Sequence, residues 1–248
     1  MSESFADHFS PVASTYALFR PTYPPDLFRW IATTAPARHV AWDCAAGSGQ
    51  ATLALAEWFD QVVATDASAA LLAEAAPHPR VTWREATAEA SGLDAASVDA
   101  LTIAQGLHWF DLERFWPEVR RVVRPGGLVA AWTYGTHEVG DAAVDAAVER
   151  FSEQVVGAFW PSERRHVDAR YATLSFPFER VVAPSFTMRA TWTLGQMVGY
   201  MRSWSATRRF VEVREHDPVI ALEVELADVW GDGAREVRWP LTVLAGIV

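Results

Sequence analysis

The segment spanning residues 40–51, VAWDCAAGSGQA, constrains the fold of this chain more than any other part of its sequence. A short apolar run ends at Asp43, and small residues that include Gly47 and Gly49 follow it directly. Apolar residues at helical spacing come next. Because glycine has no Cβ, it adopts positive φ angles and lets another molecule approach the main chain closely. The segment therefore predicts a strand, a tight bend and a helix, with the bend facing a ligand.

Strand and helix patterns alternate along residues 38–135. Strands are expected at 39–43, 61–65, 80–84, 98–104 and 128–132. Their starts lie roughly 20 to 30 residues apart, which is the length of a right-handed crossover between parallel strands. Ligands of such sheets bind beyond the carboxyl ends of the strands, where the crossovers diverge. The pattern predicts an α/β fold: a mostly parallel sheet with helices on both faces and a site at its carboxyl edge.

After residue 135 the alternation stops. Residues 141–160 have a helical period, and capping signals begin further helices at Thr193 and near Asp217. The stretches 180–191 and 237–248 have an extended pattern, which is typical of edge strands. We expect seven strands in all, an antiparallel C-terminal edge, and inserted helices that form a lid above the carboxyl rim.

Composition limits the classes of function. A formal net charge of −10 lacks the basic field of nucleic-acid binders, and the pair Arg208 and Arg209 is interpreted as solvated surface. The longest apolar stretches are about ten residues, too short to span a bilayer, and the first residues lack a signal-peptide pattern. The single cysteine excludes an internal disulfide framework, and the histidines show no spacing typical of metal ligands. We expect a cytoplasmic protein with no metal, nucleic-acid or membrane partner.

Two classes of ligand use a glycine bend after the first strand. A dinucleotide needs a third small residue where this chain has Thr52, and this mismatch weakens that interpretation. A nucleoside joined to an amino acid needs carboxylates at the ends of the first two strands, and Asp43 and Asp66 supply them. The second class is favoured, while a nicotinamide-dependent oxidoreductase stays open as an alternative.

The ordered motifs resemble those of class I S-adenosylmethionine-dependent methyltransferases of the type 11 branch, whose core is Rossmann-like. WDCAAGSGQAT is similar to the first motif, with Ala45 in place of its first glycine; alanine suits this turn if its φ is negative. VVATDAS, EATAEA, IAQGLHWFD and RVVRPGGLVAAW are similar to the motifs that follow in order. The resemblance implies S-adenosylmethionine as cofactor. The cofactor-binding residues that it implies are Tyr16, Arg20, Asp43, Ala45, Gly47, Gly49, Asp66, Ala67, Thr87, Ala88, Glu89 and Gln105.

The N-terminal segment YALFRPTYP is similar to one in relatives of trans-aconitate methyltransferase, where it folds over the cofactor. By this resemblance, residues 1–35 form an N-terminal helical lid and residues 36–135 form the S-adenosylmethionine-binding core. Residues 136–248 supply helical insertions and sheet-completing strands of the same domain. Arg20 would pair with the methionine carboxylate of the cofactor.

Those relatives esterify small carboxylic acids, so the resemblance implies O-methylation of a small molecule such as a carboxylate. A carboxylate acceptor needs no base, whereas a phenol or alcohol would benefit from one, and His108 is the candidate catalytic base. The protein is expected to be a monomer or a homodimer. A non-catalytic S-adenosylmethionine-binding protein remains an alternative to an enzyme. The candidates for the acceptor site are Trp109, Tyr134, Trp160, Tyr200, Arg202 and Trp204.

Overall fold

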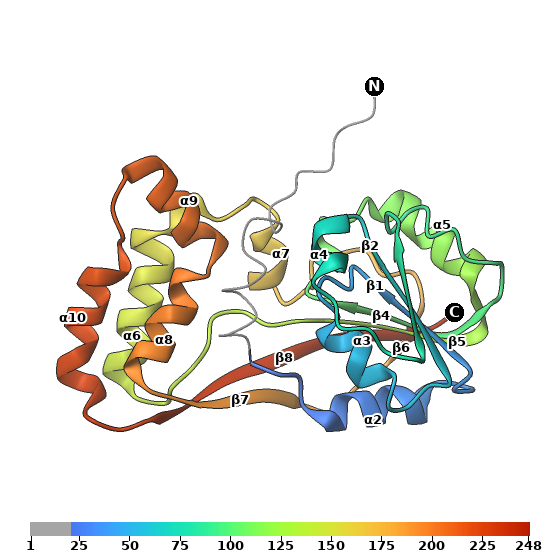
Figure 1. The fold of residues 1–248 in the computed structure, drawn as a ribbon, viewed down its shortest axis with the longest axis horizontal. Coiled ribbons are helices and arrows are strands. Elements are labelled where there is room, and N and C mark those ends of the chain that lie inside the picture. Colours follow the sequence, from blue (N-terminus) through green and yellow to red (C-terminus); the bar gives the residue numbers. More distant parts are fainter. Residues whose placement is uncertain (1–20) are drawn as a thin grey trace.

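In residues 21–248, which the computed structural model of this protein describes, eight strands form the sheet that carries the fold (Figure 1). The strands are β1 Val40–Cys44, β2 Gln61–Asp66, β3 Val81–Glu85, β4 Val98–Ala104, β5 Val123–Thr133, β6 Glu179–Val181, β7 Phe186–Trp192 and β8 Arg235–Ile247. Seven follow the order β3-β2-β1-β4-β5-β8-β6, and β7 pairs with β8 outside this path. Strands β1 to β5 are parallel, and β8 is antiparallel to β5, β6 and β7.

Helices cover the sheet and extend beyond it. The helices and helical turns are α2 Pro25–Thr34, α3 Gln50–Leu55, α4 Ala69–Ala73, η2 Leu107–Trp109, α5 Leu112–Val122, α6 Ala142–Arg150, η3 Phe151–Val155, η4 Gly157–Phe159, α7 Arg164–Asp168, α8 Leu194–Arg202, α9 Ser205–Arg214 and α10 Val219–Trp230. The predicted class, a mostly parallel sheet with an antiparallel C-terminal edge and added helices, is confirmed.

The C-terminal edge contains one strand more than expected. The extended stretch predicted at residues 180–191 is two strands, because β6 and β7 pair with different parts of the long β8. The first part of β8, up to Leu241, pairs with β7, and its last part lies between β5 and β6. In Figure 1, β7 and β8 run from the sheet toward the helices at its far end. The single strand β8 thus connects the sheet to the helices at its far end.

Side chains of the parallel strands alternate between two apolar layers, as the pleat of a strand requires. Ala41 and Ala100 belong to the layer that contains α2 and α3, whereas their neighbours Trp42 and Leu101 belong to the layer that contains α5. All four side chains are fully buried. Both faces of the sheet are therefore covered by helices, as parallel strands need.

Helix α2 packs on the sheet. Pro25 takes its first position, and Leu27 and Ile31 are fully buried. The ring of Phe28 meets Trp132 of β5 edge-on, with 6.1 Å between the centroids. Residues 1–20, and with them most of the segment predicted as an N-terminal lid, lie outside the described residues. The division of the chain at residue 35 stays a prediction.

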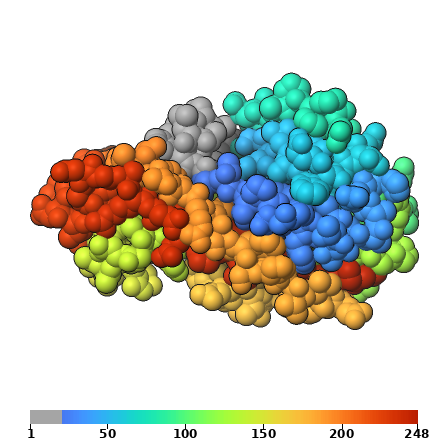
Figure 2. Space-filling view, turned by 90° about the horizontal axis from the view of Figure 1, so that it is seen from below, coloured from blue at the N-terminus to red at the C-terminus, as the bar shows by residue number. Residues whose placement is uncertain are grey.

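Helices α6, α8, α9 and α10 gather beyond one end of the sheet, on the left of Figure 1. Thr193 and Gln196 form the predicted capping box of α8, and Gly231, with a φ of 74°, ends α10. Figure 2 shows α10 in red and α6 in yellow-green on one side of the molecule, with the first strands and helices in blue on the other. Within residues 21–248, each helix is too short or too polar to cross a lipid bilayer.

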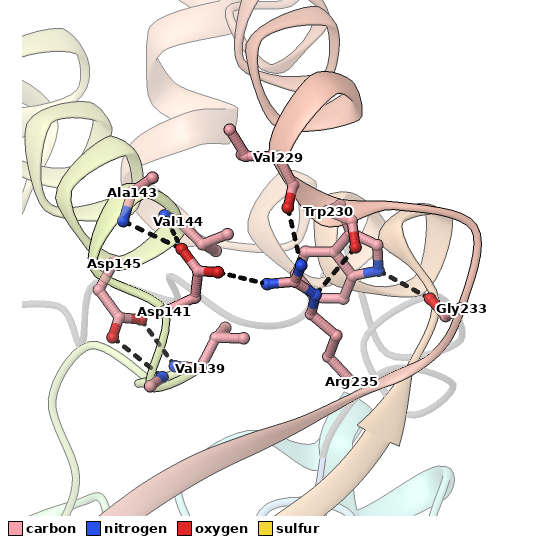
Figure 3. Close-up of polar contacts among 10 residues, drawn as sticks. Val139, Asp141, Ala143, Val144, Asp145, Val229, Trp230, Gly233 and Arg235 are labelled. Carbon is pink, nitrogen blue, oxygen red and sulfur yellow. Dashed lines mark hydrogen bonds and ion pairs between the residues drawn. The ribbon is translucent and has the colours of Figure 1, made fainter.

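Arg235, at the start of β8, connects these helices to the sheet through hydrogen bonds (Figure 3). Its guanidinium donates hydrogen bonds to Asp141 at 2.9 Å and to the carbonyl oxygens of Val229 and Trp230 at 2.7 and 2.8 Å. Asp141 also accepts a hydrogen bond from the N–H of Ala143, at the start of α6. Because a planar guanidinium can serve several acceptors at once, one side chain joins the ends of α6, α10 and β8.

Candidate active site

The bends that follow β1 and β4 meet at the carboxyl edge of the sheet, where the strand order changes direction. Ala45, Gly47 and Gly49 have left-handed backbone angles, with φ of 57°, 57° and 92°. Gln105, directly after β4, also has a positive φ, of 56°. The chain therefore turns sharply on two adjacent strands at the same edge. This is the edge at which the glycine bend predicts a ligand.

The condition under which alanine would suit this turn, a negative φ, is not met, since Ala45 has the left-handed angle that a glycine adopts readily. The N–H of Ala46 donates to the carbonyl of Thr65 at 3.0 Å and so fixes the bend against the end of β2. The Ala45 side chain packs on Gly106, where an added Cβ would lie 2.9 Å from it. A left-handed alanine costs about 1 kcal/mol, so tertiary contacts impose the bend against a local preference.

Gly47 and Asp66 lie side by side. The N–H of Gly47 donates to one carboxylate oxygen of Asp66 at 2.8 Å, and the N–H of Ser68 donates to the other at 2.8 Å. Among the described residues, no heavy atom lies within 4 Å of a Cβ built on Gly47. Each carboxylate oxygen can accept more than one hydrogen bond. An open bend beside a largely buried carboxylate fits the sugar of an adenosyl ligand, whose hydroxyls are donors.

Gly49 has a different reason to be glycine. A Cβ at this position would lie 2.2 Å from the six-membered ring of Trp83, a residue of β3. The close approach of an indole ring to the main chain therefore already requires glycine here. The sequence does not reveal this packing, because Trp83 is brought to the bend only by the pairing of β2 with β3.

Asp43 lies inside the protein, beneath the bend. Its two carboxylate oxygens accept hydrogen bonds from the hydroxyls of Thr52 at 2.6 Å and Thr102 at 2.7 Å. Burial raises the pKa of Asp43 to about 6, although the two hydroxyls oppose this shift. Asp43 thus connects β1, α3 and β4. Thr52, which departs from the dinucleotide pattern, is one of its two hydroxyl partners.

Replacing Asp43 by asparagine should flatten the pH dependence of folding stability. In the folded protein Asp43 keeps its proton up to about pH 6, whereas the unfolded carboxyl loses it near its ordinary pKa of 3.8. Its contribution to stability therefore falls as the pH rises from 4 to 6, by about 2 to 3 kcal/mol. Asp43→Asn removes this loss. Urea unfolding of both proteins between pH 4 and 7 tests it, and parallel stability curves would contradict it.

The other residues implied for the cofactor are distributed around this edge. Ala88 is buried and Thr87 is exposed in the loop after β3, and Ala67 is half-buried directly after Asp66. Glu89 accepts a hydrogen bond from the N–H of Asp111, the residue that caps α5, at 3.0 Å. Tyr16 and Arg20 lie outside the described residues.

Gln105 connects the ends of β4 and β5. Its side-chain amide donates to the carbonyl of Tyr134 at 3.0 Å and accepts a hydrogen bond from the Thr133 hydroxyl at 2.5 Å. This pair of contacts fixes the orientation of the amide, because only its nitrogen can donate to a carbonyl. Gln105, fixed by these two hydrogen bonds, therefore lies between the bend and the cavity.

A cavity opens above Gln105 and His108, between the sheet edge and helices α7, α8 and α9. Its volume is about 850 Å³, including the solvent at its mouth. Five of the six residues predicted for the acceptor site line it: Trp109, Tyr134, Trp160, Tyr200 and Trp204. The sixth, Arg202, is one of the described residues but does not line the cavity. Its guanidinium pairs with Asp217 at 2.7 Å and Glu223 at 2.8 Å and so joins α8 to α10.

Two arginines that the sequence did not single out for this site also line the cavity. The guanidinium of Arg164 lies 4.4 Å from the ring centroid of Trp160 and donates to Asp168 at 2.8 Å. Arg208, interpreted from sequence as solvated surface, is half-buried in the cavity wall, and burial lowers its pKa. Among the described residues that line the cavity, none is aspartate or glutamate. The charged side chains among these lining residues are therefore both arginines.

His108 is a neutral imidazole in this cavity at neutral pH. Burial lowers its pKa to about 4, and the positive charge of Arg164 adds to the shift. Its Nδ1 lies 3.0 Å from the hydroxyl oxygen of Tyr171. A neutral imidazole can accept a proton or donate a hydrogen bond, depending on which nitrogen carries the hydrogen.

Known proteins are similar to this chain in sequence over most of its length. Residues 42–131, from β1 to β5, match the family described as “Methyltransferase domain”. A “Putative methyltransferase” of Dictyostelium discoideum is 32% identical over 86% of this chain and 82% of its own length. A “Probable S-adenosylmethionine-dependent methyltransferase” of Saccharomyces cerevisiae is 26% identical over 90% of this chain and 86% of its own.

A solved structure agrees over nearly the whole chain. The “Putative Type II Methyltransferase from Anaeromyxobacter dehalogenans” superposes with a TM-score of 0.87 and 45% identity, covering 92% of this chain and 98% of that one. These similarities support methyl transfer and not the nicotinamide-dependent alternative. The open bend at Gly47 beside the Asp66 carboxylate fits the cofactor of this family. The chain belongs to the class I S-adenosylmethionine-dependent methyltransferases.

Proposed function

We propose that the enzyme methylates an oxygen of a small anionic molecule, and that this oxygen belongs to a carboxylate. The observation that carries the proposal is the cavity wall, which has Arg164 and Arg208 and, among its described residues, no acidic side chain. Arginine binds carboxylates through paired hydrogen bonds of matching geometry. The N-terminal resemblance to relatives of trans-aconitate methyltransferase points to the same class of acceptor.

The residues at the sheet edge would hold the cofactor. Asp66 would accept hydrogen bonds from the ribose hydroxyls, and the Gly47 bend would lie against the sugar. The loop after β3, with Thr87 and Ala88, would border the adenine, and Gln105 would face the methionine end. Bound there, S-adenosylmethionine would supply a methyl group on a sulfonium, from which a neutral thioether departs as a good leaving group.

The chain's own task is then to align the acceptor and exclude water. An in-line displacement needs the attacking oxygen close to the methyl carbon and on the side opposite the sulfur. Trp160 and Trp204, whose ring centroids are 5.5 Å apart with the rings tilted by 42°, give the cavity an apolar wall. Arg164 is held by its stacking on Trp160 and its ion pair with Asp168. Because a carboxylate arrives as an anion, no residue has to remove a proton.

A panel of acceptors tests the proposal. Small carboxylic acids, phenols and amines are each incubated with the enzyme and S-adenosylmethionine, and products are identified by mass spectrometry. We expect methyl esters of carboxylic acids. Methylation of phenols or amines alone would overturn the carboxylate assignment. Cofactor binding by calorimetry without any product would favour the non-catalytic alternative.

Arg164→Gln should raise KM for a carboxylate acceptor about 10- to 100-fold, since a charge-assisted hydrogen bond is lost. The affinity for S-adenosylmethionine should not change. Arg165→Gln is the matched control, because this neighbour lies on the same helix, is exposed, and does not line the cavity. Equal KM values for the two variants would remove Arg164 from the acceptor site.

A further inference from the structure

Tyr171, which contacts His108, is buried and its backbone conformation is fixed by the surrounding structure. It follows α7, and both Arg170 and Tyr171 have left-handed φ angles, of 52° and 60°. The N–H of Tyr171 donates to the carbonyl of His166 at 2.8 Å, and its side chain is only 1% exposed. Bulky residues rarely adopt this conformation, so the surrounding core must impose it. The result is a phenol oxygen fixed behind the cavity, 3.0 Å from Nδ1 of His108.

The hydrogen-bond directions around this phenol can be derived. The Gln105 amide donates to the Tyr134 carbonyl, so its oxygen faces Thr133 and the Thr133 hydroxyl must donate to it. Burial raises the pKa of Tyr171 well above its ordinary value, and contacts with the Thr133 side chain and the Leu107 backbone oppose this shift only in part. The phenol therefore keeps its hydrogen at neutral pH.

Tyr171 has one hydrogen to donate, and Nδ1 of His108 lies 3.0 Å from its hydroxyl oxygen. An unprotonated imidazole nitrogen is a stronger acceptor than a phenol oxygen. A phenol is also a stronger hydrogen-bond donor than a neutral imidazole N–H, which disfavours donation from His108 to Tyr171. The hydroxyl of Tyr171 therefore donates to Nδ1 of His108. A neutral histidine whose Nδ1 accepts carries its hydrogen on Nε2, the ring nitrogen left for an occupant of the cavity.

We propose that Tyr171 is a positioning residue that holds His108 in the Nε2–H tautomer, so that His108 donates a hydrogen bond to the acceptor and is not a general base. The donor role rests on the proposed carboxylate acceptor, whereas the tautomer does not. Arg164, Arg208 and the Nε2–H of His108 then give the cavity three donors for a group that only accepts. A hydroxyl acceptor would find no unprotonated nitrogen to take its proton. This arrangement selects carboxylates over phenols and alcohols.

The tautomer is measured directly, without any reaction. Long-range ¹H–¹⁵N correlation spectra of the full-length protein distinguish Nε2–H from Nδ1–H histidine, and His108→Gln assigns the signals. We expect His108 as Nε2–H in the wild type, and a shift toward Nδ1–H in Tyr171→Phe, which keeps the ring but removes the donor. Finding Nδ1–H in the wild type, or the same tautomer population in both proteins, would overturn the proposal.

Kinetics with a carboxylate acceptor test the donor role. His108→Gln keeps an N–H donor near the position of Nε2 but cannot act as a base, so its kcat/KM should stay within about tenfold of the wild type. His108→Ala should lose clearly more, and Tyr171→Phe should lose about tenfold with unchanged affinity for S-adenosylmethionine. Equal losses in the glutamine and alanine variants would exclude the donor role. If no carboxylate reacts at all, the proposed function fails, while the spectra still decide the tautomer.

Discussion

Asp66→Ala is expected to weaken binding of S-adenosylmethionine by roughly 30- to 1000-fold. The carboxylate accepts the N–H of Gly47 and of Ser68, each at 2.8 Å, and would also accept the ribose hydroxyls. Hydrogen bonds to a charged group contribute about 1.5 to 3 kcal/mol each, so losing one ribose contact accounts for the lower figure. The larger figure follows if the bend also relaxes, because Gly47 then loses its anchor.

Isothermal titration calorimetry measures this loss, and two further variants define its cause. Asp66→Asn keeps one acceptor oxygen and should bind with an intermediate affinity. Asp60→Ala is the matched control. Asp60 is an exposed carboxylate directly before the first residue of β2, whereas Asp66 is the last residue of that strand, and Asp60 pairs with His39 at 3.2 Å. Its affinity should equal that of the wild type. An unchanged dissociation constant in Asp66→Ala would remove Asp66 from the cofactor site.

Trp239→Ala is expected to lower the free energy of unfolding by about 3 to 5 kcal/mol, the usual loss for a buried tryptophan. Trp239 lies in the first part of β8 and is fully buried. Its ring meets Trp192 at 4.9 Å and Tyr200 at 5.5 Å between centroids, and its Nε1 donates to the Tyr200 hydroxyl at 3.2 Å. The substitution thus leaves a cavity in the apolar layer between β7, β8 and α8.

Because Tyr200 also lines the cavity, the same variant should raise KM for the acceptor. Trp239→Phe keeps most of the apolar volume but loses the hydrogen bond, so its loss of stability should be about 1 to 2 kcal/mol. Chemical denaturation at constant pH gives both values. A Trp239→Ala protein as stable as the phenylalanine variant would mean that the layer collapses around the missing ring.

The sequence predicted the elements whose causes are local. The capping box of Thr193 and Gln196 and the stop at Gly231 depend on contacts within a few residues, and the structure has both. The strand–bend–helix at residues 40–51 and the spacing of strands β1 to β5 also sufficed for the parallel sheet. Parallel order follows from them because right-handed crossovers leave few other topologies.

Contacts between distant segments decided the rest. The sign of φ at Ala45 is set by β2 and by Gly106, and the need for glycine at position 49 by Trp83. The cavity gains Arg164 and Arg208 because α7, far along the chain, contacts η2 directly after β4, and α9 lines the same cavity. A pattern in one segment cannot show which side chains another segment brings to it. The sequence alone therefore determined the sheet and its ligand edge, whereas tertiary packing decided the charge of the cavity and the partner of His108.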